Sequence, residues 1–175
     1  MPLNPGEQTR LMHGETLIHL SFMPDDVIAV NGSILCNAEP RDVWQSLTDY
    51  DHLSDYLPKV VASRVTKRTD EEIILEQTGK TGIFIFEKTV HFRLKVQEEK
   101  EKKVLFEQLD GDFTLYRGEW MLETDDALQG TILSYHAEIK PRFFAPPILV
   151  SFVEWQDLPG ILKAHKQRSE SISGT

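Results

Sequence analysis

One histidine that could take part in acid–base chemistry, His91, lies two positions before Arg93 in the same stretch of the chain. An imidazole titrates near neutral pH, so His91 could act as a general acid or base if it faced a substrate. The same alternate positions also carry Lys95, whose charged amine favours solvent. We therefore predict that His91 lies on an exposed outer face, and the sequence assigns no catalytic residue.

A larger set of aromatic side chains is the candidate lining of a ligand cavity. Tyr and Trp within it add a polar tip to an apolar body, which suits an amphipathic ligand. The predicted ligand-binding set is Phe84, Phe86, Phe92, Phe106, Tyr116, Trp120, Tyr135, Phe152 and Trp155. Ordinary core packing is the alternative for each member, because large apolar side chains are mostly buried.

Alternation within strands decides which neighbour of two such residues can face the interior. His136 follows Tyr135 directly, so only one of them can point inward, and Tyr135 is the better fit. Glu119 stands in the same relation to Trp120. We predict that both aromatic residues point inward.

The sequence contains no pattern for a metal, nucleotide or hydrolase site. The six histidines show no ligand spacing such as H-x-x-x-H, and Cys36 has no cysteine partner. G-x-G-x-x-G, G-x-x-x-x-G-K-[ST] and G-x-S-x-G are all missing from the sequence. We expect no metal site and no cofactor.

Charge and composition restrict the kind of partner. With 28 acidic against 19 basic residues, the net charge of −9 gives no global basic field for a nucleic-acid backbone. No apolar run reaches membrane-spanning length, and residues 1–10 do not look like a secretory signal. A single cysteine fits a reducing compartment. These features predict a cytoplasmic protein for which only transient membrane contact stays open, and they leave the oligomeric state undetermined.

A long helix is predicted from residue 147 to 168. Proline is tolerated in a first turn, and an apolar stripe at helical spacing follows over residues 148–155. The stripe changes phase after Pro159, which cannot donate to the carbonyl four residues earlier. We expect a kink there, or a second helix start with Asp157 as its N-cap.

The preceding residues supply a surface of strands for this helix. Residues 27–36 alternate as a strand, with Gly32 interpreted as a bulge or bend. Two short helices follow, one beginning at Pro40 and one capped by Asp49. Six strands are then predicted at 60–65, 73–78, 84–96, 104–109, 113–122 and 131–139, with a turn at 79–82 among others. Their spacing indicates an antiparallel meander.

These elements predict an α+β fold in which a curved antiparallel sheet wraps around the long C-terminal helix, with two short helices after the first strand. One helix leaves a gap against such a sheet unless large side chains fill it. Residues 1–15 are expected to be a loose arm, followed by a weak edge strand at 16–22. The domain division is an arm at 1–25, a ligand-binding domain at 26–170 and a flexible tail at 171–175.

Several local strings carry a resemblance to a known family. They are Val43-Trp44 with Leu47-Thr48-Asp49-Tyr50 and Leu57-Pro58, Gly111-Asp112-Phe113 with Gly118-Glu119-Trp120, Gly130-Thr131 with Tyr135, and Asp157-Leu158-Pro159 with Leu162. In order and spacing the chain resembles the START-like (SRPBCC) superfamily with the helix-grip fold of the birch pollen allergen. Its polyketide cyclase/dehydrase and coenzyme-Q-binding branch is the most similar. The resemblance implies a START-like domain with a cavity for an apolar or amphipathic small molecule.

Three classes of function remain open from the sequence. The leading hypothesis is binding or carriage of a hydrophobic ligand such as a lipid, quinone or isoprenoid-like molecule. The second is a polyketide cyclase or aromatase in which Tyr or His polarises carbonyl groups without metal or nucleotide. The third is a protein-interaction module whose cavity is filled by side chains. The enzyme is disfavoured because the sequence shows no inward-facing acid–base pair.

Overall fold

The computed structural model describes residues 3–81, 87–142 and 147–174, and for residues 147–156 it describes only the helical backbone. Within these ranges the chain forms one eight-stranded antiparallel sheet and four α-helices. The elements in chain order are α1 (Pro5–Met12), β1 (Leu17–Phe22), the 3-10 helix η1 (Pro24–Asp26), β2 (Ile28–Cys36), α2 (Pro40–Thr48), the 3-10 helix η2 (Tyr50–His52), α3 (Leu53–Tyr56), β3 (Val60–Arg68), β4 (Ile73–Thr81), β5 (Lys88–Glu99), β6 (Lys103–Gly111), β7 (Phe113–Thr124), β8 (Thr131–Pro141) and α4 (Pro147–Ser173).

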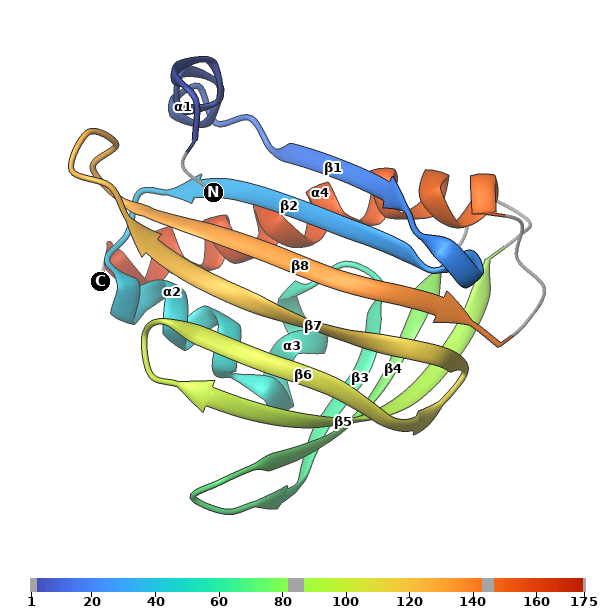
Figure 1. Cartoon of the computed structure of the whole chain (residues 1–175). Coiled ribbons are helices and arrows are strands. Elements are labelled where there is room, and N and C mark those ends of the chain that lie inside the picture. The colour runs from blue at the N-terminus through green and yellow to red at the C-terminus, as the bar shows by residue number, and fades with distance from the viewer. Residues whose placement is uncertain (1–2, 82–86, 143–146, 175) are drawn as a thin grey trace.

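The sheet is strongly curved and holds α4 on its concave side (Figure 1). Its strand order is β1-β2-β8-β7-β6-β5-β4-β3, so β2 closes onto β8 while β3 to β8 form a continuous meander. The short helices α2 and α3 follow β2 and cover one end of the curve. This arrangement confirms the predicted helix-grip fold.

Alternation along β5 shows why the sheet has one apolar and one polar face. Val90, Leu94 and Val96 are buried, whereas His91 and Arg93 between them are exposed. Nδ1 of His91 lies 3.0 Å from the Thr78 hydroxyl on the outer face. The prediction that His91 lies outside is therefore confirmed.

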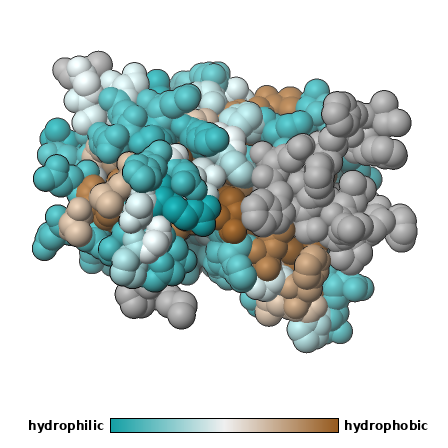
Figure 2. All heavy atoms as spheres, turned by 90° about the horizontal axis from the view of Figure 1, so that it is seen from above, coloured by the Kyte–Doolittle hydropathy of each residue, from teal (hydrophilic) through white to brown (hydrophobic). Residues whose placement is uncertain are grey.

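The exposed apolar side chains that the structure describes are scattered over several elements. Hydrophilic side chains cover most of the described surface seen from above, with smaller apolar patches between them (Figure 2). Within the part of the chain whose side chains the structure describes, the exposed large apolar ones are Met12, Phe22, Met23, Val61, Leu105 and Leu109. In the part of the chain that the structure describes, no helix combines the length and apolarity needed to cross a bilayer.

Gly32 does not form the predicted bulge. It lies in regular register opposite Tyr135 within β2. A Cβ atom at this position would stand 2.8 Å from Leu158 Cδ2 and 3.0 Å from Leu162 Cδ1. The glycine is needed because α4 approaches β2 closely, which the local sequence does not reveal.

The N-terminal residues also differ from the predicted loose arm. Asn4 and Glu7 form a capping box for α1, in which each side chain accepts a hydrogen bond from the other residue's backbone N–H. Leu11 of this helix is buried beside Leu35 and Leu128. The edge strand is present as β1, paired with β2. The boundary at residue 26 and the flexible tail stay predictions.

Helix α4 continues through Pro159 without interruption from Pro147 to Ser173. The alternative of a second helix start capped by Asp157 is therefore wrong. Proline removes only one backbone donor, and the packing of the helix on both sides of Pro159 outweighs that loss. Leu158 and Leu162 flank the proline and are both buried.

We predict that Gly32→Val lowers the free energy of unfolding by about 1–3 kcal/mol, because the new side chain overpacks the contact with α4. Denaturant unfolding monitored by circular dichroism measures the change. Asn31→Val changes the exposed neighbour on the same strand and should cost less than about 1 kcal/mol. Equal losses in the two variants would contradict the close-approach explanation.

Candidate functional site

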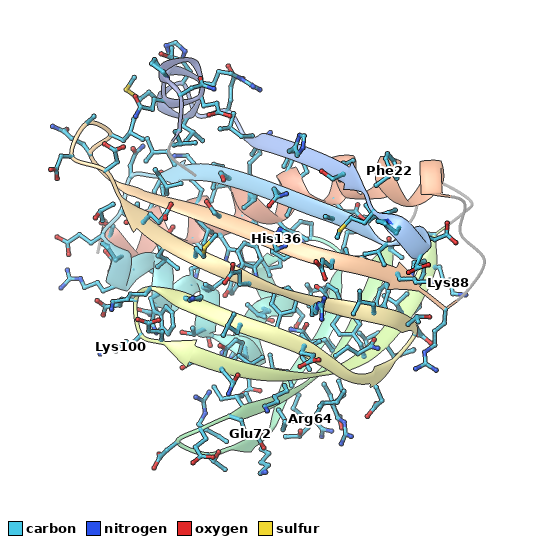
Figure 3. The ribbon with its side chains drawn as sticks, viewed as in Figure 1. Phe22, Arg64, Glu72, Lys88, Lys100 and His136 are labelled. Carbon is cyan, nitrogen blue, oxygen red and sulfur yellow. The ribbon has the colours of Figure 1, made fainter. Side chains whose placement is uncertain are left out.

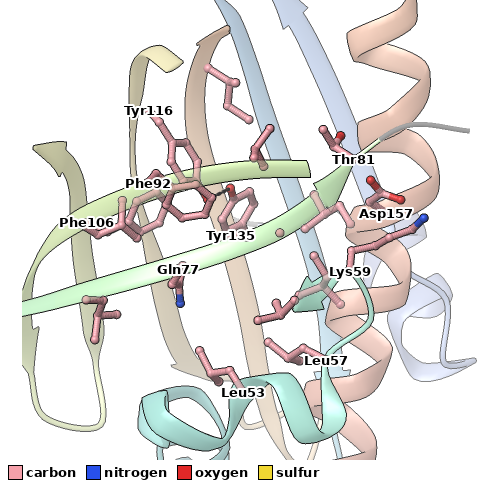
Figure 4. Close-up of a pocket in the computed structure, with 18 of the residues that line it drawn as sticks. Leu53, Leu57, Lys59, Gln77, Thr81, Phe92, Phe106, Tyr116, Tyr135 and Asp157 are labelled. Atoms are coloured by element: carbon pink, nitrogen blue, oxygen red, sulfur yellow. Dashed lines mark hydrogen bonds between the residues drawn. The ribbon is translucent and has the colours of Figure 1, made fainter. Parts of the chain in front are cut away.

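A cavity of about 410 Å³ lies between the concave face of the sheet, α4 and the helices α2 and α3 (Figure 4). Aliphatic side chains from both layers form much of its wall. They are Leu47, Leu53, Leu57, Val60, Leu75, Val90, Leu94, Val96, Val104, Ile139, Leu158 and Ile161. An apolar wall of this kind gives favourable contact to an apolar molecule and little to water.

Aromatic rings from β5 to β8 form the sheet side of the cavity. The rings touch in sequence: Phe92 and Tyr116 have centroids 5.3 Å apart, and Phe106 lies 5.2 Å from Tyr116. Tyr135 stacks on Phe106 at 5.9 Å and meets Trp120 at 4.7 Å. Such a continuous ring surface can bind a planar or elongated apolar molecule through dispersion and edge-to-face contacts.

Two phenol groups give this aromatic wall a polar point. The hydroxyl oxygens of Tyr116 and Tyr135 lie 3.3 Å apart and face the cavity from neighbouring strands (Figure 4). Hydroxyl groups can donate and accept hydrogen bonds, so the pair can bind an oxygen of a ligand.

Charged side chains gather at one end of the cavity, where its wall reaches solvent. Lys59 and Lys80 lie 3.2 and 3.4 Å from the carboxylate of Glu87. The hydrogen bond from Lys59 lowers the pKa of Glu87. Asp157 and Lys59 flank this end of the cavity (Figure 4). Burial raises the pKa of the Asp157 carboxyl from 3.8 to about 6, with Lys59 opposing the shift.

Strand β4 extends further than predicted, and its extra residues contribute to this charged end. Residues 79–81 continue the strand in pairing with β5, where the sequence predicted a turn at 79–82. Thr81 pairs with Lys88, and both border the cavity. The glycine and polar residues that indicated a turn are tolerated because the register with β5 satisfies their backbone groups.

The opposite end of the cavity is polar but uncharged. His165 of α4 is buried there, with Nδ1 3.0 Å from the hydroxyl of Ser46. Burial lowers the pKa of His165 to about 3, so its ring is neutral at physiological pH. Tyr50 donates to Glu98 at 2.6 Å nearby, and burial, with Glu98 adding to the effect, raises the pKa of this phenol.

The structure places five of the nine predicted ligand-binding residues on the cavity wall. These are Phe92, Phe106, Tyr116, Trp120 and Tyr135. Phe84 and Phe86 lie outside the described residues, as do the side chains of Phe152 and Trp155. The inward direction of Tyr135 and Trp120 is confirmed by their place in the wall.

The neighbours of these aromatic residues point outward, as predicted. His136 lies on the outer face of β8, where its Nδ1 is 2.8 Å from the Asn31 side chain (Figure 3). Glu119 lies on the same outer face, 3.9 Å from the amine of Lys103.

Some wall residues were missed by the sequence reasoning. Phe113 and Tyr116 are three residues apart, so in a regular strand they would face opposite sides of the sheet. Both line the cavity because β7 has a register shift between Phe113 and Leu115. Asp157 and His165 border the cavity from α4. Their eight-residue separation places Asp157 and His165 near one face of the helix. In the sequence this spacing indicated packing of the helix and not a cavity wall.

Most of the chain matches a known protein family. A model of the family described as polyketide cyclase / dehydrase and lipid transport matches residues 36–166. The match runs from the last residue of β2 into α4 and therefore includes most of the cavity wall. A search of curated proteins found no significant match.

Solved structures with the same fold come from several organisms. TTHA0849 from Thermus thermophilus superposes with a TM-score of 0.71 at 20% identity, over 83% of this chain and 99% of that chain. The Zhui aromatase/cyclase from Streptomyces sp. R1128 gives 0.70 at 14% identity, over 82% and 94%. A STAR-related lipid transfer protein fragment from Xanthomonas axonopodis gives 0.62 at 17% identity, over 87% and 98%. These identities show a shared fold and no more.

We predict that Asp157→Asn removes a pH-dependent loss of stability. Well below pH 3.8 the carboxyl is protonated in both the folded and the unfolded state, so it does not affect stability. Between pH 3.8 and about 6 the carboxyl ionises in the unfolded chain but stays protonated in the folded protein, which lowers the stability of the folded wild type. A shift of about two pKa units corresponds to about 2.7 kcal/mol, and partial exposure reduces this to about 1–1.5 kcal/mol.

Urea unfolding at a series of pH values from about 4 to 7 measures this difference between wild type and variant. The control is Asp70→Asn, which changes an exposed carboxylate in the β3–β4 turn. A wild type and Asp157→Asn variant with parallel pH profiles would contradict the raised pKa.

Proposed function

The chain belongs to the polyketide cyclase/dehydrase and lipid transport family, and from this premise we propose that it binds and carries an apolar or amphipathic small molecule in the cavity between the sheet and α4. The observation that carries the proposal is the cavity itself. Protein interiors are close-packed, with few voids larger than a water molecule. A space of about 410 Å³ lies instead in the ordinary range of ligand pockets, roughly 300–1,000 Å³.

The chemistry of the wall supports an amphipathic rather than a purely apolar ligand. The aromatic and aliphatic middle section accommodates a hydrocarbon or ring system. The charged end with Lys59 and Asp157 can bind a polar group close to solvent. We propose Phe92, Phe106, Tyr116, Trp120 and Tyr135 as the residues that contact the apolar part.

One observation favours the enzyme as a second candidate. The Tyr116 and Tyr135 hydroxyl groups face the cavity together and could polarise a carbonyl group of a reactive chain. Polarisation alone does not move protons, and the buried His165 has a pKa too low to act as a base near neutral pH. Binding without turnover is therefore the proposed function.

An interaction module with a filled cavity is the third candidate. The cavity volume argues against it, because side chains of the described residues leave this space open. A surface role would also need an apolar or strongly charged patch, whereas among the described residues the exposed large apolar side chains come from α1, β1, β3 and β6 as well as the β1–η1 junction.

We predict that at least one hydrophobic molecule among menadione, farnesol, palmitate and protoporphyrin IX stabilises the folded protein. At a hundredfold excess over Kd, a ligand that binds only the folded state adds about 2.7 kcal/mol. For a domain of this size that corresponds to a rise of about 5–10 °C in Tm. Thermal unfolding followed by circular dichroism measures the rise, and no rise with any of the four compounds would contradict a carrier function.

Filling the cavity should abolish that rise without unfolding the protein. Val90 faces the cavity from β5 and pairs with Gly79, which has no side chain to oppose a larger neighbour. We predict that Val90→Phe stays folded and loses at least about tenfold in affinity for the stabilising compound, about 1.4 kcal/mol. Thr89→Phe adds the same ring to the exposed face of the same strand and should keep the wild-type affinity.

The enzyme alternative has its own test. We expect no turnover of a linear polyketone chain incubated with the protein and followed by mass spectrometry. Turnover that Tyr116→Phe abolishes while binding persists would establish the cyclase alternative instead.

A further inference from the structure

His165 is almost completely enclosed on the cavity wall, with 1% of its surface exposed. Its ring is placed by contacts from three elements. The Ser46 hydroxyl of α2 lies 3.0 Å from Nδ1, and the rings of Trp120 and Tyr56 meet it edge-on at centroid distances of 5.3 and 6.1 Å. These contacts hold the imidazole in one orientation.

The hydrogen bond with Ser46 determines which ring nitrogen carries the proton. The Ser46 side chain is fully buried, and His165 Nδ1 is its hydrogen-bond partner in the structure. A buried hydroxyl that donates to nothing is costly, so Ser46 donates its proton and Nδ1 accepts it. A neutral imidazole with an accepting Nδ1 has its hydrogen on Nε2.

Nε2 of His165 is directed at the cavity. Among the described residues, none donates to or accepts from this nitrogen. The same residues contain no buried side-chain nitrogen or oxygen that lacks a partner, so Nε2 is in contact with open space. The open space that the ring borders is the cavity.

We propose that the Nε2–H of His165 donates a hydrogen bond to a carbonyl oxygen of the bound molecule, and that Ser46 acts as the positioning residue that keeps the proton on Nε2. This inference rests on the proposed function and narrows its ligand class to apolar molecules with a ketone, quinone or ester carbonyl at their inner end. The donor lies at the uncharged end of the cavity, away from Lys59 and Asp157.

A carbonyl group fits this end better than a hydroxyl group. A ligand hydroxyl would bring a proton that needs an acceptor, and the rings around His165 offer none to the cavity. The indole of Trp120 can only donate, and Tyr56, whose hydroxyl oxygen could accept, does not line the cavity. An ionised carboxylate would be buried without a cationic partner, which is costly.

The position of the proton can be measured without any ligand. Nitrogen-15 chemical shifts distinguish a protonated from an unprotonated imidazole nitrogen, and His165→Phe identifies the His165 signals by their loss. We expect Nε2 protonated and Nδ1 unprotonated in wild type. Ser46→Ala should shift the ring towards a mixture of tautomers, whereas Ser169→Ala should leave it unchanged because Ser169 donates to the backbone carbonyl of His165. A wild-type proton on Nδ1 would overturn the proposal.

Binding of a matched pair of probes tests the donor itself. Fluorene and 9-fluorenone have the same ring skeleton, but only fluorenone has a carbonyl group. We expect wild type to bind fluorenone about three- to tenfold more tightly, as measured by isothermal titration calorimetry. His165→Phe should reduce this ratio to about one, Ser46→Ala should reduce it in part, and Ser169→Ala should keep it.

The outcomes separate this proposal from the function on which it rests. Equal affinity of wild type for the two probes, or a preference that survives in His165→Phe and Ser46→Ala, would overturn the carbonyl donor while leaving the hydrophobic carrier intact. If neither probe binds, the carbonyl donor fails, whereas the carrier function is decided separately by the four compounds of the thermal-unfolding test. If His165→Phe does not fold, Ser46→Ala against Ser169→Ala decides the question.

Discussion

The close contact between α4 and β2 is the constraint on which the rest of the structure depends. Gly32 lets Leu158 and Leu162 approach the strand, and the Lys166 amine donates to the carbonyl of Leu35 at 2.7 Å. Further along, the side chain of Glu170 accepts from the backbone of Asn37. These contacts fix the helix along the β1–β2 side of the sheet. Strands β3 to β7 curve away from it, so their concave face is left to border a space.

The character of that space follows from the elements that surround it. Antiparallel strands present alternate side chains to one face, so the inward positions of β5 to β8 form a nearly continuous apolar wall. The end of β4 and the residue before β3 bring Lys80 and Lys59 to one end, where α4 contributes Asp157. Helix α2 brings Ser46 to the other end, against His165. The result is an apolar cavity with a charged outer end and a neutral polar inner end.

Apart from Nε2 of His165, the polar groups of Ser46, Tyr56 and Ser169 at the inner end are satisfied by neighbouring groups. Ser46 serves twice, since its hydroxyl donates to His165 and its backbone carbonyl accepts from Tyr56. Ser169, one turn further along α4, donates to the carbonyl of His165. A set of buried hydrogen bonds like this holds side chains rigidly, because breaking any one leaves an unpaired polar group. Such rigidity suits a site that must present a single donor to a ligand.

The strands with regular alternation were the part of the fold that the sequence could predict. The alternation along β5 predicted its inward positions, and the same logic correctly placed Tyr135 and Trp120 inside. Features that depend on two distant segments were out of reach. Gly32 appeared to be a bulge because the helix that needs it lies more than a hundred residues further along the chain. Ser46 and His165 are separated by 119 positions, so neither residue alone indicates a pair.

Two local features account for further differences between the predicted and the observed structure. A register shift in β7 turned Phe113 inward against its expected alternation. The capping box of Asn4 and Glu7 was overlooked because a proline- and glycine-containing segment was interpreted by composition alone. The prolines that begin α2 and α4 correctly predicted helix starts. Proline is favoured in a first turn because the N–H group that it lacks would have no partner there.

Native mass spectrometry of the protein purified from its own source, combined with organic extraction, tests the central claim most directly. The account predicts a population with added mass that extraction removes, and an extracted small molecule that is mainly apolar. Val90→Phe prepared in the same way should lack that mass, whereas Thr89→Phe should retain it. A protein that carries no small molecule, or one whose bound molecule is unaffected by filling the cavity, would contradict the account.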